Sequence, residues 1–455
     1  MRSRASRKGS VLITCTIFLV VFMALAVGVA SMSGSSLQIA NNQHQANQAF
    51  ASAESGLEVV RYWLSRVRMP SSTPVAEYLP TVILNVRSDL KANSISNVIF
   101  NSDGSIPPVA VEPITGQSFS GHISLDPCDP TVLRLYVTGS SRQAARTIRV
   151  EYTIEPYHFP IFNYGMATKG PLELQYNPRF LAATEGWEAD IYVESPNDLI
   201  AVDIGKNATL AGDIDIGNPQ AGISCGGALN LGGEVHMVAE EDQPEFPVPD
   251  VQRFRQYATG PVIGPGSDLS GSSMTLPNAV IAAGTNPTFA GNVTIQGILY
   301  IEAPNRVTFE RNTSVQGMIV AEGDVGNPGT NQINFGDPAY PSTPSNFASG
   351  PYPAGAQFDA LRSEVGSCIL APGFAVSFWK NFSAINGVIA ASGLRFDNNA
   401  SATVLGTLIN YSEQSTVVTR NINMTFDRAA MVEIPAGFDL LRVLIYKPKS
   451  YSIVL

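Results

Sequence analysis

The sequence has few charged residues, few histidines and few cysteines, and each scarcity excludes a class of function. Only 15% of its 455 residues are charged, and the net charge of −10 gives a surface that should attract neither nucleic acid nor anionic lipid. The four cysteines form no Cys-x-x-Cys pair, which excludes a standard zinc module. The four histidines are not spaced as a metal pair, and no phosphate loop, dinucleotide fingerprint or nucleophile elbow is present. We therefore predict no catalytic residue, no metal, no cofactor and no nucleic-acid partner.

Turn-forming residues are abundant instead. The 39 glycines and 31 prolines, with frequent Asn, Ser and Thr, favour β structure with many turns. Cys15 lies in the first apolar segment. For Cys128, Cys225 and Cys368 the sequence leaves two alternatives open, one disulfide among them or free buried thiols.

The N-terminus has the layout of a membrane segment. Four basic residues within 1–8 precede Gly9, and a nearly unbroken apolar run follows at 11–30. That run is long enough to cross a bilayer, and the basic residues before it place the N-terminus in the cytoplasm and the bulk outside it. A secretory signal would end there, but apolar residues recur at three- and four-residue steps until Pro70. We therefore predict one helix over 10–69, a rod of roughly 85 Å at ~1.5 Å per residue.

A family resemblance is carried by this helix. Its amphipathic part has the form Ala-Phe-x-x-Ala-Glu-x-Gly-Leu-Glu, contributed by Ala49, Phe50, Ala53, Glu54, Gly56, Leu57 and Glu58. Together with the basic leader and the apolar helix start, it resembles type IV pilin-like proteins, in particular the minor pilins of the PilX-like pilus-assembly family. The resemblance covers residues 1–69 strongly and the next hundred loosely.

The resemblance implies how the chain is processed and what it contacts. A prepilin peptidase would remove the leader, residues 1–9, by cutting after Gly9 and leaving Ser10 as the first residue. The protein would then lie in the inner membrane as a single-pass protein with its bulk in the periplasm, or outside the cell at a pilus tip. Other pilin-like subunits would pack against the helix, at Thr14, Phe50, Glu54, Gly56, Leu57 and Glu58.

Thr14 departs from the pattern of major pilins. Counting from Ser10 it is the fifth residue, where major pilins usually have a glutamate that pairs with the amino terminus of a neighbouring subunit. A buried ammonium without a partner costs several kcal/mol, so the missing acid should weaken ordinary insertion along a filament. In the family, this loss goes with subunits at the tip or in accessory roles. The alternative is that the segment is only a membrane anchor.

A small antiparallel α+β domain is predicted over residues 70–164. A short helix is expected near residues 75–93, followed by strands near 121–125, 132–137 and 147–154, the last two with alternating apolar and polar residues. In pilins, such a sheet packs against the end of the long helix.

The remainder, residues 165–455, contains an internal repeat. Segments 289–299 and 309–319 match position by position at an offset of 20, and less regular copies begin at Ile204, Phe378 and Phe396. This period is typical of a β-solenoid, whose coils bury their apolar edges only by stacking. Irregular spacing between copies favours a right-handed parallel β-helix.

Each residue type of the repeat has an expected role. Phenylalanines would stack inside, asparagines would hold tight corners, and glycines would permit sharp bends. These residues are Phe289, Phe309, Phe378 and Phe396, then Asn292, Asn312, Asn381 and Asn399, and Gly297, Gly317, Gly387 and Gly406.

Two insertions interrupt the repeat, near residues 239–273 and 326–360. They either form binding surfaces or cover a flank of the solenoid. The apolar C-terminus, from Phe438 onward, is expected to be a docked last strand or a cap.

The predicted protein is α+β, mainly β, and non-enzymatic. It would be a minor pilin or pseudopilin of a type IV pilus or a related secretion system, with the solenoid displayed for adhesion or assembly toward a surface or glycan ligand. One alternative is a membrane-anchored envelope protein without a filament. The other is a tethered polysaccharide-degrading enzyme that uses acids such as Asp213 and Asp215, which alternate to one face of a strand.

Overall fold

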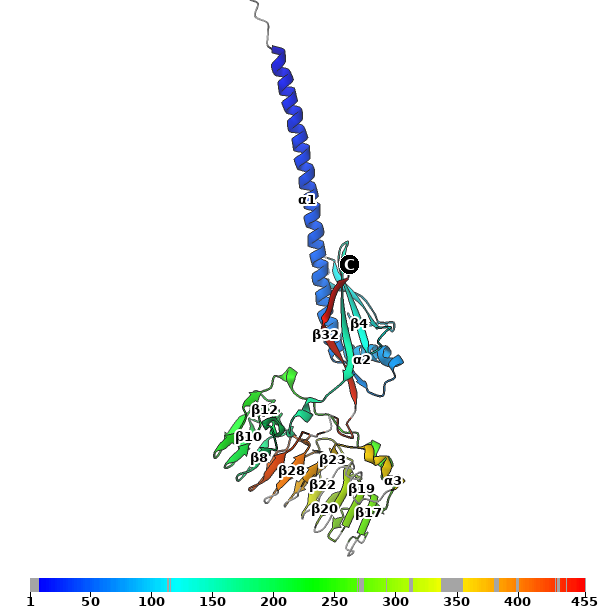
Figure 1. The fold of residues 1–455 in the computed structure, drawn as a ribbon, viewed down its shortest axis with the longest axis vertical. Helices are drawn as coiled ribbons and strands as arrows, with labels where there is room; N and C mark the ends of the chain where they lie inside the picture. Colours follow the sequence, from blue (N-terminus) through cyan, green and yellow to red (C-terminus); the bar gives the residue numbers. More distant parts are fainter. Residues whose placement is uncertain are drawn as a thin grey trace, which may run out of the picture. The chain divides into compact units, whose positions relative to one another are not determined.

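The computed structural model describes residues 8–112, 114, 116–267, 269, 274–291, 293–310, 314–336, 355–379, 384–397, 401–429, 431, 434–438 and 440–454. Within these ranges the chain forms a long N-terminal helix, an antiparallel sheet and a series of stacked parallel coils (Figure 1). The predicted fold class, α+β and mainly β with a solenoid, is confirmed. The chain divides into two compact units. The helix–sheet unit comprises Met1–Tyr157 and Leu440–Leu455, and the solenoid unit comprises His158–Asp439.

In the helix–sheet unit, an antiparallel sheet packs against the C-terminal half of the long helix, α1. The strand order is β1-β32-β5-β4-β3-β2. Inward residues alternate with outward ones, so Leu133, Leu135 and Val137 of β4 are buried while Arg134 and Tyr136 between them are half-buried. The elements are α1 (Lys8–Ser65), β1 (Arg68–Pro70), η1 (Val75–Glu77), α2 (Tyr78–Ala92), β2 (Ser105–Glu112), β3 (Gln117–Leu125), β4 (Val132–Ser141), β5 (Ala144–Pro156) and β32 (Leu441–Val454).

The two ends of this sheet differ from the sequence expectations. Helix α1 ends at Ser65, before the expected end at residue 69, because Arg68 pairs with Val443 and belongs to β1. The C-terminal segment, expected within a solenoid domain of 165–455, is β32, which pairs antiparallel with β1 and β5. Its place next to β5 depends on partners that are hundreds of residues earlier, which no local pattern reveals.

Three parallel sheets line the solenoid unit. Sheet 1 has the spatial order β15 (Val235–Met237), β12 (Ile214–Ile216), β9 (Ile191–Val193), β6 (Met166–Thr168), β29 (Leu408–Asn410), β26 (Val388–Ala391), β23 (Ser367–Ala371), β21 (Ser314–Ala321), β19 (Val293–Ile301), β17 (Met274–Ile281) and β16 (Val262–Ile263). Sheet 2 has β13 (Gly222–Cys225), β10 (Ile200–Ile204), β7 (Leu172–Leu174), β30 (Thr416–Val418), β27 (Leu394–Phe396), β24 (Ala375–Phe378), β22 (Gln332–Phe335), β20 (Arg306–Phe309) and β18 (Thr288–Phe289). Sheet 3 has β14 (Leu229–Leu231), β11 (Ala208–Leu210), β8 (Arg179–Ala182), β31 (Asn423–Phe426), β28 (Ser401–Leu405) and β25 (Ala384–Asn386).

Short helical turns connect these strands. They are η2 (Pro160–Asn163), η3 (Gly186–Ala189), η4 (Glu240–Asp242), η5 (Gln252–Tyr257), α3 (Ala356–Asp359) and η7 (Leu361–Ser363). The apolar residues that point inward from all three sheets form one continuous core.

The coils are not stacked in sequence order. Strand β6, from the first coil, lies in the middle of sheet 1, between β9 and β29. From β6 to β15 the coils advance to one end of sheet 1. The chain then resumes at the opposite end with β16, and the coils advance in the same direction until β29 lies beside β6. Met166 of the first coil therefore pairs with Leu408 of the last. Both ends of the solenoid unit thus leave from neighbouring coils, as an insertion between the paired strands β5 and β32 requires.

The segment between β15 and β16, called the strap below, joins the two ends of sheet 1. The ring of Phe246 lies 6.0 Å from that of Tyr192 and 6.3 Å from that of Tyr411, which belong to the middle of the sheet. Farther along, the Tyr257 hydroxyl donates a 3.0 Å hydrogen bond to Glu364. The strap accounts for most of the first predicted insertion, and it covers a flank of the solenoid.

Candidate functional site

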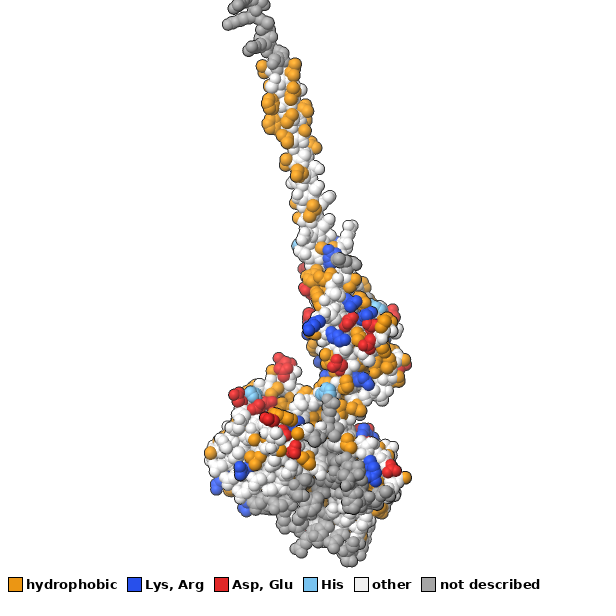
Figure 2. Space-filling model, in the orientation of Figure 1, with side chains coloured by type: hydrophobic (Ala, Val, Ile, Leu, Met, Phe, Trp, Pro, Cys, Tyr) orange, Lys and Arg blue, Asp and Glu red, His pale blue; other side chains and the backbone are white. Residues whose placement is uncertain are grey.

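The N-terminal half of α1 is an exposed apolar rod. It contains a stretch long and apolar enough to cross a membrane, with a mean hydropathy of 2.7 over 18 residues and none of that window buried. Figure 2 shows the apolar side chains gathered on this part of the helix. Thr14 lies exposed among them. Gly9 and Ser10 belong to the first turns of α1, and their side chains lie outside the described part of the structure.

The C-terminal half of α1 is divided between two faces. Gly56 and Leu57 are buried against the unit's own sheet. A Cβ atom on Gly56 would lie 2.4 Å from the Phe119 ring, so only glycine allows the helix to approach so closely. Glu54 and Glu58 are exposed, while Phe50 is half-buried. Of the residues predicted to contact neighbouring subunits, two are therefore used inside the molecule.

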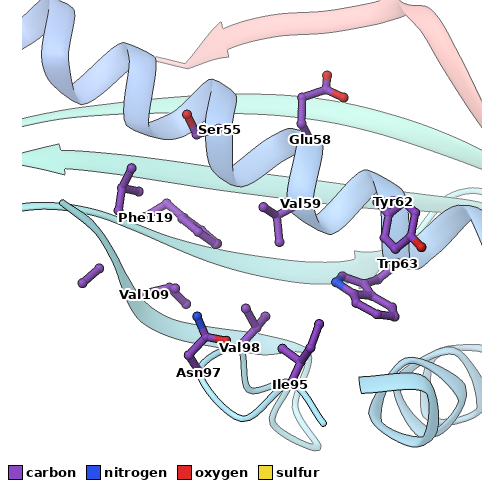
Figure 3. A pocket seen from close by; sticks show the side chains of 12 residues that line it. Ser55, Glu58, Val59, Tyr62, Trp63, Ile95, Asn97, Val98, Val109 and Phe119 are labelled. Atoms are coloured by element: carbon purple, nitrogen blue, oxygen red, sulfur yellow. The ribbon is translucent and has the colours of Figure 1, made fainter. Parts of the chain in front are cut away.

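An apolar groove of 580 Å³ lies beside this half of the helix. Figure 3 shows Val59 and Trp63 of α1 and Phe119 of β3 pointing toward Val98 and Val109 from the other side. Ser55, Glu58, Tyr62, Ile95, Asn97, Ala110 and Val111 complete its lining. Part of the helix thus stays accessible between the sheet and the segment that leads into β2.

A ladder of phenylalanine rings runs along the inside of sheet 2. The ring centroids of Phe289 and Phe309 are 5.2 Å apart and those of Phe378 and Phe396 are 5.3 Å apart, with nearly parallel planes. Phe335 lies between the two pairs, 5.0 Å from Phe309 and 4.9 Å from Phe378. Sequence reasoning missed Phe335, because the second insertion follows it and hides its copy of the repeat.

A shorter signal would have found Phe335. The pattern aliphatic-polar-Phe occurs both at Ile333–Phe335 and at Val376–Phe378. The inward position of the ladder continues with aliphatic residues where the last coil meets the first, since Phe396 pairs with Val418, Val418 with Leu174 and Leu174 with Ile204. Ile204 begins the copy of the repeat that has no phenylalanine.

The repeat glycines lie where stacked coils approach closely. Gly297, Gly317 and Gly387 have φ values of +81°, +152° and +117°, which side chains rarely adopt. A Cβ atom on Gly317 would lie 1.7 Å from the Gly297 carbonyl oxygen, and one on Gly406 would lie 2.6 Å from Gly387. The corner asparagines Asn292, Asn312, Asn381 and Asn399 lie outside the described residues.

Other asparagines, which the repeat did not reveal, hold the corner between sheets 1 and 2. The Asn305 amide donates hydrogen bonds to the carbonyls of Ala282 (2.8 Å) and Glu302 (2.7 Å), and its oxygen accepts one from the Asn286 N–H (2.7 Å). The Asn331 side-chain oxygen accepts a bond from the Asn305 N–H at 3.0 Å. Each asparagine therefore satisfies backbone groups of an adjoining coil, in a corner where they would otherwise be unpaired.

A buried polar network around Arg428 and Glu188 joins the segment before β6 to the segment after β31 in the solenoid unit. The Arg428 guanidinium, in a residue only 7% exposed, donates to the carbonyls of Phe162 and Asn163. Burial lowers the pKa of Arg428 to about 10. The Glu188 carboxylate accepts N–H bonds from Thr184 (2.7 Å) and Arg428 (3.2 Å). Burial alone would raise the pKa of Glu188, but these backbone donors bring it below its ordinary value of 4.5.

The acids of the enzymatic alternative are engaged in holding coils together. Asp215 accepts a 2.7 Å hydrogen bond from the Tyr164 hydroxyl, and Asp213 accepts one of 2.7 Å from the Glu234 N–H. Burial raises the pKa of nearby Asp190, and the charges of Asp213 and Asp215 add to that effect. Among the described residues, no group of three or more His, Cys, Asp or Glu side chains is arranged to hold a metal ion.

The four cysteines are free. Cys368 is buried in the solenoid core, and burial raises the pKa of its thiol to about 12. Cys128 and Cys225 are exposed in different units.

Comparison with known proteins identifies the long helix. Residues 8–58 match the model of the PilX N-terminal family. The N-terminal helix is PilX-like. The match is confined to α1, a small part of the chain, and the apolar first half of this helix is consistent with a membrane anchor.

Beyond the PilX-like helix the comparisons are weak. A solved structure, that of the competence-associated pilin ComZ from Thermus thermophilus, aligns with 90% of this chain and 98% of its own at 12% identity, with a TM-score of 0.30. A likeness at that score supports no argument. No curated protein matches the chain.

Proposed function

We propose that the chain is a non-enzymatic minor pilin-like subunit, which enters a type IV pilus or a related secretion system through α1 and displays the solenoid unit. The observation that carries this proposal is the surface of the PilX-like helix. No Lys, Arg, Asp or Glu occurs between Gly9 and Ala53, and every described side chain from Val11 to His44 is exposed. Such a surface suits a bilayer and then a bundle of similar helices far better than water.

Processing would prepare this helix for assembly. A prepilin peptidase at the cytoplasmic face of the inner membrane would cut after Gly9 and leave Ser10 as the N-terminus. The four basic residues of the leader would then be lost, which changes the net charge from −10 to −14. The remaining N-terminal segment would be free of charged side chains, with the solenoid unit on the periplasmic side.

Two of the residues proposed for contact with neighbouring subunits are buried within the chain. Gly56 and Leu57 pack against the chain's own sheet. The exposed face keeps Glu54 and Glu58, with Glu58 lying 3.5 Å from the Arg61 guanidinium. We propose that these acids, with Phe50 and the apolar groove at Val59, face other pilin-like subunits.

Thr14 favours an end or accessory position over one in the middle of a filament. A threonine hydroxyl cannot neutralise the ammonium group of a neighbouring N-terminus, and an unpaired charge in an apolar interior is costly. A subunit at the tip has a neighbour on one side only. The solenoid unit would there be displayed outward, toward a surface or a glycan.

The insertion of the solenoid unit supports a display role. Its first and last coils are paired with each other, and the chain after it forms β32, which pairs with β5. The solenoid unit is therefore an insertion in the sequence of the helix–sheet unit. A polysaccharide-degrading alternative is less well supported, because Asp213 and Asp215 already accept hydrogen bonds that join coils.

Fractionation of the producing cells tests the proposal. We expect the wild-type chain in filaments sheared from the cell surface. A Gly9→Val variant should stay in the membrane fraction with its leader attached. Gly28→Ala is the matched control, because a Cβ atom at Gly28 meets nothing within 4 Å in the chain, and this variant should reach the filaments. Normal filaments that lack the wild-type chain would instead support the membrane-anchored envelope protein.

A further inference from the structure

The outer face of sheet 2 has a groove on the side away from the phenylalanine ladder. Its volume is 430 Å³, and its floor is formed where β24 and β27 begin, by the small residues Ala375 and Gly393. Because side chains alternate along a strand, the residues between those of the phenylalanine ladder point outward into this groove. Polar and aromatic groups that line it are Gln332, Asn334, Ser377, Trp379, Arg395 and Gln414.

Trp379 is half exposed and is held in a fixed position. Its ring nitrogen donates a 3.1 Å hydrogen bond to the Ser377 hydroxyl, which in turn donates one of 2.6 Å to the Asn334 side-chain oxygen. A tryptophan that is 49% exposed leaves a large apolar surface in water, and its hydrogen-bonding edge is already satisfied. What remains available is the face of the indole ring.

The charge of the groove is balanced by an internal ion pair. The Arg395 guanidinium makes two hydrogen bonds to Asp397, at 2.5 and 3.2 Å, and the nearly buried Asp397 also accepts one of 2.8 Å from Thr419. A guanidinium has five N–H donors, so several remain for a ligand after these two bonds. The described residues of the groove therefore offer donors without a net positive charge.

We infer that this groove binds a neutral glycan, an oligosaccharide of uncharged hexopyranose units. A pyranose ring presents a flat patch of C–H groups that packs on an aromatic face, and its hydroxyls exchange hydrogen bonds with amides, hydroxyls and guanidinium groups. The indole of Trp379 supplies the aromatic face, and Gln332, Gln414 and Arg395 supply the hydrogen-bonding groups. The inference deepens the proposed display function, on which it rests, by naming the class of ligand.

Acidic glycans fit less well than neutral ones. Among the described residues that line the groove, Arg395 is the only cation and Asp397 already neutralises it; since the net charge of the chain is −10, a uronic-acid polymer would meet repulsion there. Sheet 1 offers no equivalent face where Phe246 of the strap packs on Tyr192 and Tyr411.

Fluorescence titration of the purified full-length chain tests the inference. The detergent must contain no sugar, so lauryldimethylamine oxide is suitable and maltosides are not. The probes are cellohexaose, maltohexaose and hexa-N-acetylchitohexaose as neutral ligands and trigalacturonate as an acidic one. We expect at least one neutral hexasaccharide to change the tryptophan emission saturably, and trigalacturonate to have no effect.

Matched variants assign the site. Isothermal titration calorimetry, which does not depend on the tryptophan signal, should show binding weakened at least tenfold by Trp379→Ala and about threefold by Gln332→Ala. Trp187→Ala is the control, because Trp187 is 50% exposed elsewhere in the solenoid unit. This variant should bind the hexasaccharide as tightly as the wild type does. The wild-type titration alone tests whether a neutral hexasaccharide binds. A variant that fails to fold therefore does not affect that test.

Three outcomes would overturn the inference. They are no binding of any neutral hexasaccharide, binding of trigalacturonate alone, and binding that Trp187→Ala removes but Trp379→Ala does not. The titration needs no filament, so its failure leaves the proposed assembly function standing. A chain that binds glycans but never enters filaments would refute the assembly function alone.

Discussion

The side-chain amide of Asn410 donates a 3.0 Å hydrogen bond to the hydroxyl of Thr168, 242 positions earlier in the chain. The same amide donates one of 3.0 Å to Thr416, and all three residues are fully buried. Asn410 ends the strand β29 of the last coil, and Thr168 ends β6 of the first. The junction between the first and last coils is therefore closed by a buried polar network as well as by apolar packing.

Asn410→Ala should destabilise the solenoid unit strongly. The substitution removes the acceptor of the Gly393 and Ser412 N–H groups, at 2.7 and 2.9 Å, and leaves two buried hydroxyls with one partner fewer. Each unsatisfied buried group costs about 1–3 kcal/mol, so we expect a loss of at least about 2 kcal/mol in the free energy of unfolding. Urea denaturation followed by circular dichroism measures it. Asn197→Ala, at an exposed site, is the control, and equal effects of the two would contradict the role of the junction.

Phe335→Ala should remove the middle ring of the ladder. Its neighbours Phe309 and Phe378 would face a cavity, and a buried Phe→Ala substitution typically costs 3–5 kcal/mol, so a loss of about that size is expected. Phe335→Leu should cost less, because part of the volume is kept. Thermal unfolding detects both. If the alanine variant unfolds at the same temperature as the wild type, the ladder does not stabilise the solenoid.

The Glu188 network predicts a dependence on pH. Its folded-state pKa lies below the ordinary 4.5, so its contribution to stability is present above that value and is lost as the pH falls through the folded-state pKa. Glu188→Gln should therefore lose stability at pH 7 and show a flatter stability profile below pH 4.5. Asp190 has a raised pKa, so its contribution is present at low pH and lost as the pH rises. Asp190→Asn should then gain stability at pH 7. Denaturation of both variants at pH 3–7 measures the two effects, and a change of stability opposite to the expected one in either variant would contradict this interpretation.

The place of β32 in the helix–sheet unit can be tested with two neighbouring residues. Leu444 is 5% exposed and faces the core, whereas Ile445 is 46% exposed on the other side of the same strand. Leu444→Ser should lower the protection of the β4 and β5 amides in hydrogen exchange by mass spectrometry, and Ile445→Ser should not. Reduced protection in sheet 1 of the solenoid unit instead would place β32 there.

Local patterns predicted the elements but not their long-range order. The helix, the alternation in β4 and β5, and the period near 20 residues are all visible within short windows. The order in which the coils stack is not visible there, because nothing in the sequence of the strap shows that it connects one end of the solenoid to the other. The place of strand β32 was not predicted for a related reason: the solenoid unit separates it in sequence from its partner β5.

The candidate site shows the same division. Gly56 and Leu57 belong to the family pattern, but only the structure shows that Phe119 packs on the helix there. Trp379 gave no signal at all, because an isolated tryptophan beside a strand has no period. Its significance comes from Asn334 and Ser377, which adjacent strands place beside it.

The central claim is that the chain is delivered and assembled as a pilin-like subunit. Mass spectrometry of the mature protein isolated from its native membrane tests it most directly. We expect an N-terminal peptide that begins at Ser10, with residues 1–9 absent. An intact Met1, or a new N-terminus near Ala30, would contradict it.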